Sequence, residues 1–111
     1  MVNRGDICLV DFGATQGNVQ GGYRPAIIVQ NDVGNYYSPT VLVVPITSNT
    51  RKNNLPTHVY IPEGCGGLRT NSLALAEQIQ TVNKTQIYKV VGNLGSYLAK
   101  IDDAIKISLA L

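Results

Sequence analysis

Residues 40–46 read Thr-Val-Leu-Val-Val-Pro-Ile and give the strongest strand signal in the chain. Apolar and β-branched residues fill both alternating sets of positions, a pattern typical of a strand that is buried on both faces. We therefore expect a central strand here. Pro45 has no amide hydrogen, so it must lie where the sheet requires no donor.

Shorter β-rich stretches surround this strand and predict a mainly β chain. Further strands are expected at residues 7–12, 23–30, 58–61 and 72–81. Residues 13–22 contain four glycines and predict a flexible loop, and residues 64–70 predict a turn. Residues 31–39 are polar and turn-like, with room for one helical turn.

The last third of the chain changes its hydrophobic period. Residues 84–91 allow a short helix, and residues 96–109 fit an amphipathic helix with Ser96 as its N-cap. The apolar positions that share one face of this second helix are Ile101, Ala104, Ile105 and Leu109. Short strands, Gly-rich turns and a terminal helix together predict a small, strongly bent barrel.

Length and composition fit one globular domain, residues 1–111. Apolar residues make up 44% of the chain and charged residues 14%, and this low charge argues against disorder. It also indicates that part of the surface is apolar, and a subunit interface is one explanation. The net charge of +2 permits an RNA partner without requiring one. The first six residues lack an apolar signal core and no stretch is long enough to span a bilayer, so we expect a cytoplasmic protein without a membrane partner.

The ligand-type residues are too scattered to predict a metal site or a bound cofactor. Cys8 and Cys65 match no zinc spacing, and both are expected to be free thiols. The chain has a single histidine, and its acidic residues do not cluster in the sequence. Any chemistry is therefore expected to proceed without a metal.

Two side chains at strand ends are candidates for binding a phosphate. Arg24 follows two glycines and Tyr23, and its guanidinium suits the charge that develops on a phosphate in a transition state. Thr47 ends the central strand, where its hydroxyl can donate to a phosphate oxygen. The alternatives are a structural ion pair for Arg24 and an ordinary β-branched strand residue for Thr47.

His58 and Glu77 are the candidate general bases. His58 is the only histidine, and a surface strand position is its alternative role. Glu77 lies among apolar neighbours that can raise a carboxyl pKa, although a partner arginine is equally compatible with its position. The basic loop Arg51-Lys52-Asn53-Asn54 can follow a phosphate backbone or simply be solvated.

Taken together, these stretches resemble the MazF/PemK family of toxin endoribonucleases, in the branch found in Gram-positive bacteria. The resemblance covers nearly the whole chain, from residue 4 to residue 109. Its most specific pieces are Gln20-Gly21-Gly22-Tyr23-Arg24-Pro25, Val29-Gln30-Asn31-Asp32, Pro39-Thr40, Ile46-Thr47-Ser48, Leu55-Pro56-Thr57-His58-Val59, Ser72 and Glu77-Gln78-Ile79.

The resemblance implies an SH3-like barrel that forms a homodimer and cuts single-stranded RNA without a cofactor, which arrests translation and growth. Arg24 and Thr47 would form the catalytic pair, and a 2'-hydroxyl would attack the adjacent phosphorus. The positions implied to bind RNA are Asn18, Gln20, Asn31, Leu55, Thr57 and Gln78, with residues 13–22 as a mobile cover. A cognate antitoxin with a disordered C-terminal segment is the implied partner.

Two positions depart from the family pattern. Val19 stands where many relatives carry glutamate, and Leu75 stands where one branch carries arginine. The general base therefore stays open between Glu77 and His58. The alternative function is a CcdB-like gyrase poison on the same fold, which would bind a protein through its C-terminal helix and would not cut RNA.

Overall fold

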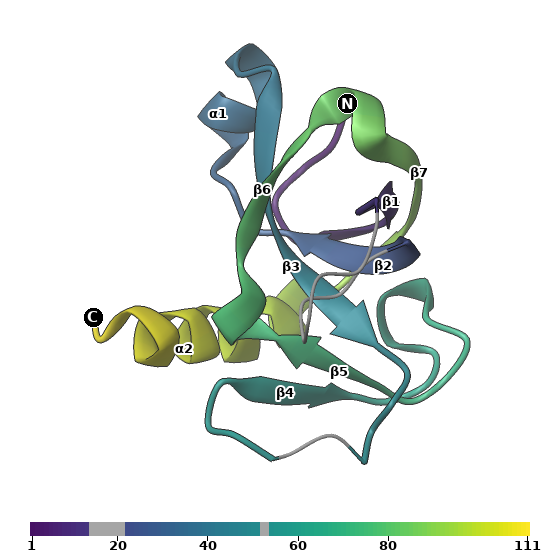
Figure 1. Ribbon diagram of the computed structural model, residues 1–111, viewed down its shortest axis with the longest axis vertical. Coiled ribbons are helices and arrows are strands. Elements are labelled where there is room, and N and C mark those ends of the chain that lie inside the picture. Colours follow the sequence, from purple (N-terminus) through teal and green to yellow (C-terminus); the bar gives the residue numbers. More distant parts are fainter. Residues whose placement is uncertain (14–21, 52–53) are drawn as a thin grey trace.

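The computed structural model describes residues 1–13, 22–51 and 54–111. The elements, in chain order, are β1 (Asp6–Asp11), β2 (Tyr23–Ile28), α1 (Asp32–Tyr37), β3 (Thr40–Thr47), β4 (His58–Ile61), η1 (Cys65–Gly67), β5 (Ser72–Leu75), η2 (Ala76–Gln78), β6 (Gln80–Asn83), η3 (Lys84–Gln86), β7 (Ile87–Asn93), η4 (Gly95–Tyr97) and α2 (Leu98–Leu109). Figure 1 shows a curled sheet with α1 at one end and α2 along one side.

The central strand predicted at residues 40–46 is confirmed as β3. It pairs with β2 along one edge, and along the other edge it pairs first with β6, up to Val43, and then with β5, from Ile46 onward. Pro45 lies in the gap between these two partners, so its missing amide hydrogen breaks no ladder on that side. The prediction for Pro45 is therefore confirmed as well.

The prediction of one continuous strand over residues 72–81 is wrong. The single 3-10 turn of η2 divides it into β5 and β6, which pair with opposite ends of β3. β5 also pairs with β4, whereas β6 does not share that partner among the described pairings. The chain turns at η2 because the strands before and after it pair with different parts of one curved sheet.

The predicted short helix over residues 84–91 is also wrong. Only η3 is helical there, and the next residues form β7, which pairs with β1 along the edge of the sheet. Ile87, Tyr88, Val90 and Val91 are β-branched or aromatic and suit this strand. A side chain at Gly92 would place its Cβ 2.3 Å from the carbonyl oxygen of Gly66, so this close approach of two backbones requires glycine.

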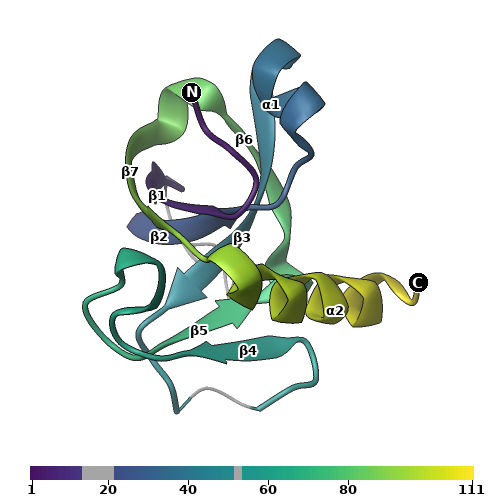
Figure 2. The same ribbon diagram turned by 180° about the vertical axis from the view of Figure 1, so that it is seen from behind.

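The predicted C-terminal helix is confirmed as α2, which packs against η2 and β4 (Figure 2). Ile101 and Ala104 are buried, whereas Leu109 is about half exposed and extends beyond the face that packs. The N-cap prediction for Ser96 is wrong, because η4 continues directly into α2 and Tyr97 takes the cap position without a side-chain bond. The Tyr97 hydroxyl instead donates to the Tyr60 carbonyl and ties the start of α2 to β4.

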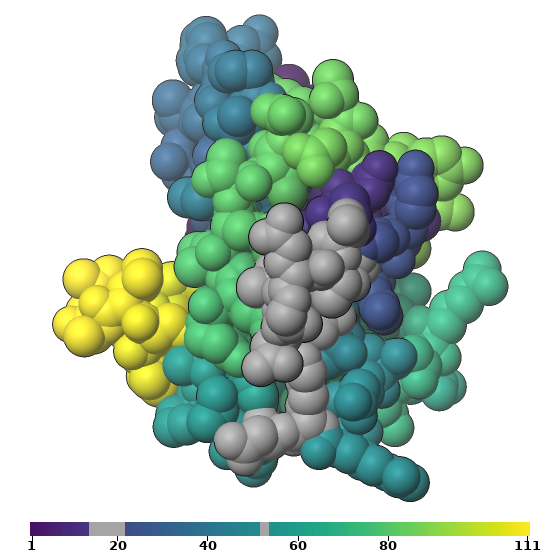
Figure 3. Space-filling model, viewed as in Figure 1, coloured from purple at the N-terminus to yellow at the C-terminus, as the bar shows by residue number. Residues whose placement is uncertain are grey.

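The core consists of two apolar clusters. One lies beneath α2 and joins Ile101 to Ile7, Ile27 and Ile46, and the other fills the curl between β1, β2, β3 and β6. In the space-filling view α2 projects from the side of the body formed by the strands (Figure 3). The predicted class, mainly β with a C-terminal helix, is confirmed, and the described strand pairs are antiparallel. Closure of the curl into an SH3-like barrel stays a prediction.

Both cysteines are free thiols, as predicted, but their surroundings differ. Burial raises the pKa of Cys8 to about 12, with a smaller contribution from the charge of Asp6. We expect iodoacetamide at pH 8 to alkylate the half-buried Cys65 and to leave Cys8 unmodified until urea unfolds the chain, because the thiolate is the reacting form. Peptide mass mapping checks this, and modification of Cys8 in the native protein would contradict it.

Candidate active site

Arg24 is the second residue of β2 and is exposed at the edge of a cleft of about 280 Å³. It pairs with Val10 of β1, so its backbone is held inside the sheet while its side chain reaches the surface. Ile46 and Ser48, at the end of β3, also line the cleft. The structure therefore places Arg24 in a concave site at the start of β2 and the end of β3.

Every charged residue among the described lining of this cleft is basic. Lys89 comes from β7 and Arg69 follows η1, so two distant parts of the chain add to the charge of Arg24. The polar lining is completed by the hydroxyl-bearing residues Ser48, Thr70, Ser72 and Tyr23. Such a lining attracts anions and suits the phosphates of a nucleic acid strand.

Thr47 lies at the same end of the β2–β3 pair as Arg24. The β2–β3 pairing ends with Ala26 opposite Pro45, and Arg24 and Thr47 each lie two positions beyond this last pair. Thr47 is only 4% exposed, is not among the residues that line the cleft, and accepts a hydrogen bond from the Asn49 amide at 3.1 Å. Joint action of the two residues on one phosphate stays a prediction.

His58 and Glu77, the candidate general bases, contact each other. The His58 Nε2 atom lies 2.8 Å from Glu77 Oε2, and the Thr57 hydroxyl donates to Glu77 Oε1 at 3.0 Å. Burial acts to raise the pKa of Glu77, but the hydrogen bonds from His58, the Glu77 backbone and Thr57 together hold this pKa below its usual value. Glu77 is therefore a weaker base than an ordinary glutamate.

Leu55 and Gln78, two positions implied to bind RNA, lie on either side of this contact. Leu55 is 39% exposed, and its amide donates to His58 Nδ1 at 3.3 Å. Gln78 is half-buried at the end of η2, directly after Glu77. The structure thus brings Leu55, Thr57 and Gln78 together around the same pair of side chains.

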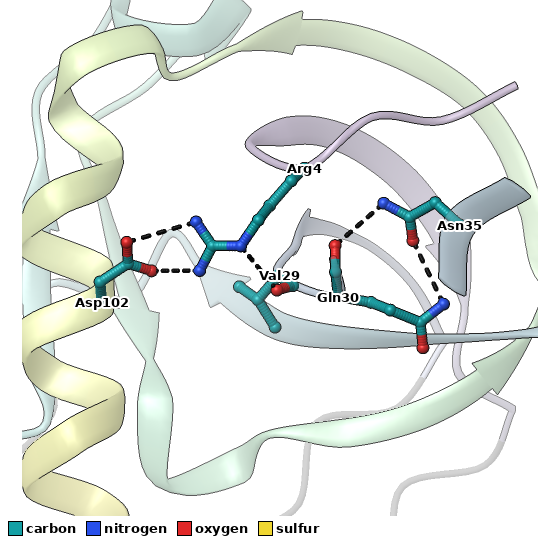
Figure 4. Close-up of polar contacts among 5 residues, drawn as sticks. All are labelled: Arg4, Val29, Gln30, Asn35 and Asp102. Atoms are coloured by element: carbon teal, nitrogen blue, oxygen red, sulfur yellow. Dashed lines mark hydrogen bonds and ion pairs between the residues drawn. The ribbon is translucent and has the colours of Figure 1, made fainter. Parts of the chain in front are cut away.

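Asn31 lies at the opposite end of β2 from Arg24. Its side chain caps α1 by accepting the Gly34 amide at 2.8 Å, a capping role that the sequence reading did not assign to it. Asn35 of α1 donates to the Gln30 carbonyl at 2.9 Å and fixes α1 against the strand end (Figure 4). A contact between Asn31 and RNA stays a prediction. Asn31 is exposed, and its hydrogen bond to Gly34 holds the side chain in place.

Arg4 is a structural residue that the sequence did not reveal. Its partners lie far from it along the chain and come close to it only when the chain folds. Its guanidinium forms a bidentate ion pair with Asp102 of α2 and donates to the Val29 carbonyl at 3.0 Å (Figure 4). The hydrogen bond to Asp102 raises the pKa of Arg4. The Arg4 amide also donates to Asp32 at 2.7 Å, so one residue joins the N-terminus, α1 and α2.

Asp32 gives a pH prediction. The Arg4 amide and the Asn35 side chain lower its pKa, so its charged form favours the folded state. This contribution is fully present above about pH 3.9, the ordinary aspartate pKa, and is lost as the pH falls through the lowered native pKa. We expect urea unfolding at pH 6 to give a higher midpoint concentration for wild type than for Asp32→Asn. The difference between the two midpoints should become smaller by pH 3. A gap that is constant with pH would contradict this.

Asn18 and Gln20 lie outside the described residues, as do Val19 and most of the loop expected to act as a cover. Lys52 and Asn53 of the basic loop also fall outside them. Arg69 and Lys89 are cleft residues that sequence reasoning missed. Only the Gly-rich turn before Arg69 carried a signal, and it indicated a turn rather than a site.

Within residues 1–13, 22–51 and 54–111, no group of three or more histidine, cysteine or acidic side chains is arranged to hold a metal ion. In the same ranges, no helix has the length and apolarity needed to cross a membrane. The cleft around Arg24 presents guanidinium, ammonium and hydroxyl groups to a ligand.

Comparison with known proteins places this geometry in a family. The family model described as "PemK-like, MazF-like toxin of type II toxin-antitoxin system" matches residues 3–109. Endoribonuclease MazF of Staphylococcus epidermidis is 44% identical over 112 residues, which cover 100% of this chain and 93% of that protein. Endoribonuclease EndoA of Bacillus subtilis (strain 168) is 41% identical, with 100% and 97% covered.

Solved structures support the fold independently. An endoribonuclease in complex with its cognate antitoxin from a mycobacterial species superimposes with a TM-score of 0.84 at 24% identity, covering 100% of this chain and 97% of that one. MazF of Deinococcus radiodurans gives 0.81 at 20% identity, covering 99% and 97%. With its sequence matched almost from end to end and its curled sheet and terminal helix shared, this chain belongs to the PemK-like, MazF-like toxin family of type II toxin–antitoxin systems.

Proposed function

We propose that this chain is an endoribonuclease toxin that cuts single-stranded RNA, chiefly mRNA, at specific sequences and without a metal. The observation that carries the proposal is the position of Arg24 in a cleft whose charged lining is entirely basic among the described residues. The named relatives are endoribonucleases, which favours this activity over gyrase poisoning. Cleavage of mRNA would stop translation and growth.

The reaction suited to this cleft is an internal transesterification. The 2'-oxygen beside the cut loses its proton to a base and bonds to phosphorus, while the bond from phosphorus to the 5'-oxygen breaks and that oxygen gains a proton. The products are a 2',3'-cyclic phosphate and a 5'-hydroxyl. Arg24 would stabilise the charge on the phosphorane and protonate or hydrogen-bond the leaving oxygen. Thr47, whose oxygen accepts the Asn49 amide, would use its own hydroxyl hydrogen to hold a phosphate oxygen.

The proposal includes two protein partners and a location. A second copy of the chain would form a homodimer, to which exposed apolar residues of β7 and α2 can contribute. A cognate antitoxin would bind through a disordered C-terminal segment that folds over the RNA groove. The antitoxin complex solved for the mycobacterial relative supports this partner. RNA cleavage of this kind would take place in the cytoplasm.

One experiment tests the activity directly. A single-stranded RNA transcript is incubated with the purified protein in excess EDTA, and the new ends are mapped by primer extension. We expect cuts at a limited set of sequences, with 5'-hydroxyl ends that accept phosphate from a kinase without prior phosphatase treatment. Intact RNA, or cutting that requires an added divalent ion, would overturn the proposal.

Arg69 and Lys89 provide a prediction on substrate binding. Both line the cleft with Arg24, so we expect Arg69→Ala and Lys89→Ala to raise KM for RNA. Each phosphate contact removed should reduce the slope of log affinity against log salt by about 0.7, the value for single strands. Titration of a non-cleavable RNA at several salt concentrations measures the slope, and an unchanged slope would show that neither residue contacts phosphate.

A further inference from the structure

His58 has both ring nitrogens engaged, and its side chain is only 4% exposed. The Leu55 amide points at Nδ1, and an amide can only donate, so Nδ1 must present its lone pair. The ring hydrogen of the neutral histidine is then on Nε2, which donates to Glu77 at 2.8 Å. A general base needs an accessible lone pair, and the lone pair of His58 already accepts the Leu55 amide.

Glu77 is engaged on both carboxylate oxygens, and its side chain is 32% exposed. One carboxylate oxygen accepts from His58 and the other accepts from the Thr57 hydroxyl. The backbone adds a further link, because the Ala76 amide, next to Glu77, donates to the Thr57 carbonyl at 3.1 Å. Three hydrogen bonds therefore join Thr57 and His58, at the start of β4, to η2.

We call the hydrogen bonds that join Thr57 and His58 to Ala76 and Glu77 the clamp. Three of the residues implied to contact RNA belong to it or lie beside it. Leu55 and Thr57 lie within three positions of His58, and Gln78 follows Glu77 directly. The contact between His58 and Glu77 therefore fixes the separation of Leu55 from Gln78 together with the Ala76–Thr57 hydrogen bond and the pairing of β4 with β5. Base recognition by splayed single-stranded RNA depends on how such contacts are spaced.

We propose that His58 and Glu77 are positioning residues that hold Leu55 and Gln78 at a fixed spacing and thereby determine which RNA sequence is cut. They orient base-contacting residues and do not take the proton from the 2'-hydroxyl. This inference rests on the proposed ribonuclease function and deepens it, because it assigns sequence selection to a specific pair of side chains.

Conservative variants separate positioning from base catalysis. In Glu77→Gln, the amide oxygen can accept from His58 and the amide nitrogen can donate to Thr57, so the clamp survives while the basic carboxylate is lost. In Glu77→Ala, both are lost. His58→Asn provides an oxygen near the place of Nδ1 that keeps the Leu55 contact and loses the Glu77 contact.

The measurements are kcat and KM on a preferred RNA, the acidic limb of the pH–rate profile, and the ratio of rates on the preferred RNA and on RNAs with one base changed. We expect Glu77→Ala and His58→Asn to raise KM and reduce that ratio by about tenfold, the loss of one oriented base contact. We expect Glu77→Gln to remain close to wild type in kcat, in the acidic limb and in the ratio. The core variant Ile101→Val controls for lost stability and should keep wild-type selection.

Each other outcome is decisive. If Glu77→Gln loses kcat as completely as Glu77→Ala, together with the acidic limb, Glu77 is the base and the inference is wrong. If all variants keep wild-type KM and selection, the clamp does not position the RNA contacts. Wild type that cuts no RNA overturns the proposed function itself, whereas wild type that cuts normally beside unaffected variants overturns only this inference. If Glu77→Ala fails to fold by circular dichroism, the comparison of His58→Asn with Glu77→Gln still decides.

Discussion

Arg24→Ala is expected to cut RNA about 10²–10³-fold more slowly than wild type, the cost of removing one preorganised group that stabilises transition-state charge. Arg24 is exposed at the edge of the cleft, so its removal leaves the core of the sheet unchanged. The loss should therefore appear in kcat, while the melting temperature stays close to that of wild type. Single-turnover cleavage in EDTA measures the rate of the chemical step directly.

Two variants make this result specific. Arg24→Lys keeps the positive charge and loses the planar fork of donors, so we expect a rate between those of wild type and Arg24→Ala. Arg69→Ala removes the same guanidinium from another position in the same cleft, and its effect should fall on KM rather than kcat. Cleavage by Arg24→Ala at the wild-type rate would remove Arg24 from the reaction, and with it the proposed mechanism.

Ile101→Ala is expected to lower the free energy of unfolding by about 2–5 kcal/mol. Ile101 is fully buried on the inner face of α2, where it packs with Ile7, Ile27 and Ile46. Truncating it removes buried apolar surface and leaves a cavity beneath the helix. Urea unfolding followed by circular dichroism measures the change through the midpoint, with the slope checked for two-state behaviour.

Asp103→Ala is the matched control for this loss. It lies on the same helix, is exposed, and is replaced by the residue with the highest helix propensity. We expect its effect to stay within about 0.5 kcal/mol, as is usual for surface positions. A loss below about 1 kcal/mol in Ile101→Ala would show that α2 contributes little to the core and that the cluster beneath it is held by the strands alone.

The local features of the fold could be predicted because they depend on the order of neighbouring residues. The double-faced apolar run of β3 identified the central strand, and the single face of Ile101 and Ala104 identified α2. The predictions for residues 72–81 and 84–91 were wrong because the local patterns of these segments are compatible with more than one structure. Their true form depends on which part of β3 or β1 they pair with, and that is a long-range property.

The candidate site divides in the same way. Arg24 and Thr47 could be selected from the sequence because each stands at the end of a recognisable strand within a family motif. The basic partners Arg69 and Lys89 could not be selected, since neither lies close in sequence to Arg24 and only the curl of the sheet brings them to one cleft.

The sequence by itself determined the class of the fold, the central strand, the terminal helix and the family, because these follow from periodicity and from motifs whose residues are close neighbours. Only the tertiary structure decided that His58 and Glu77 contact each other and that η2 separates β5 from β6. It also decided that three basic side chains line one cleft. The physical reason is that hydrogen bonds and charge act over a few ångströms in space, whatever the distance along the chain.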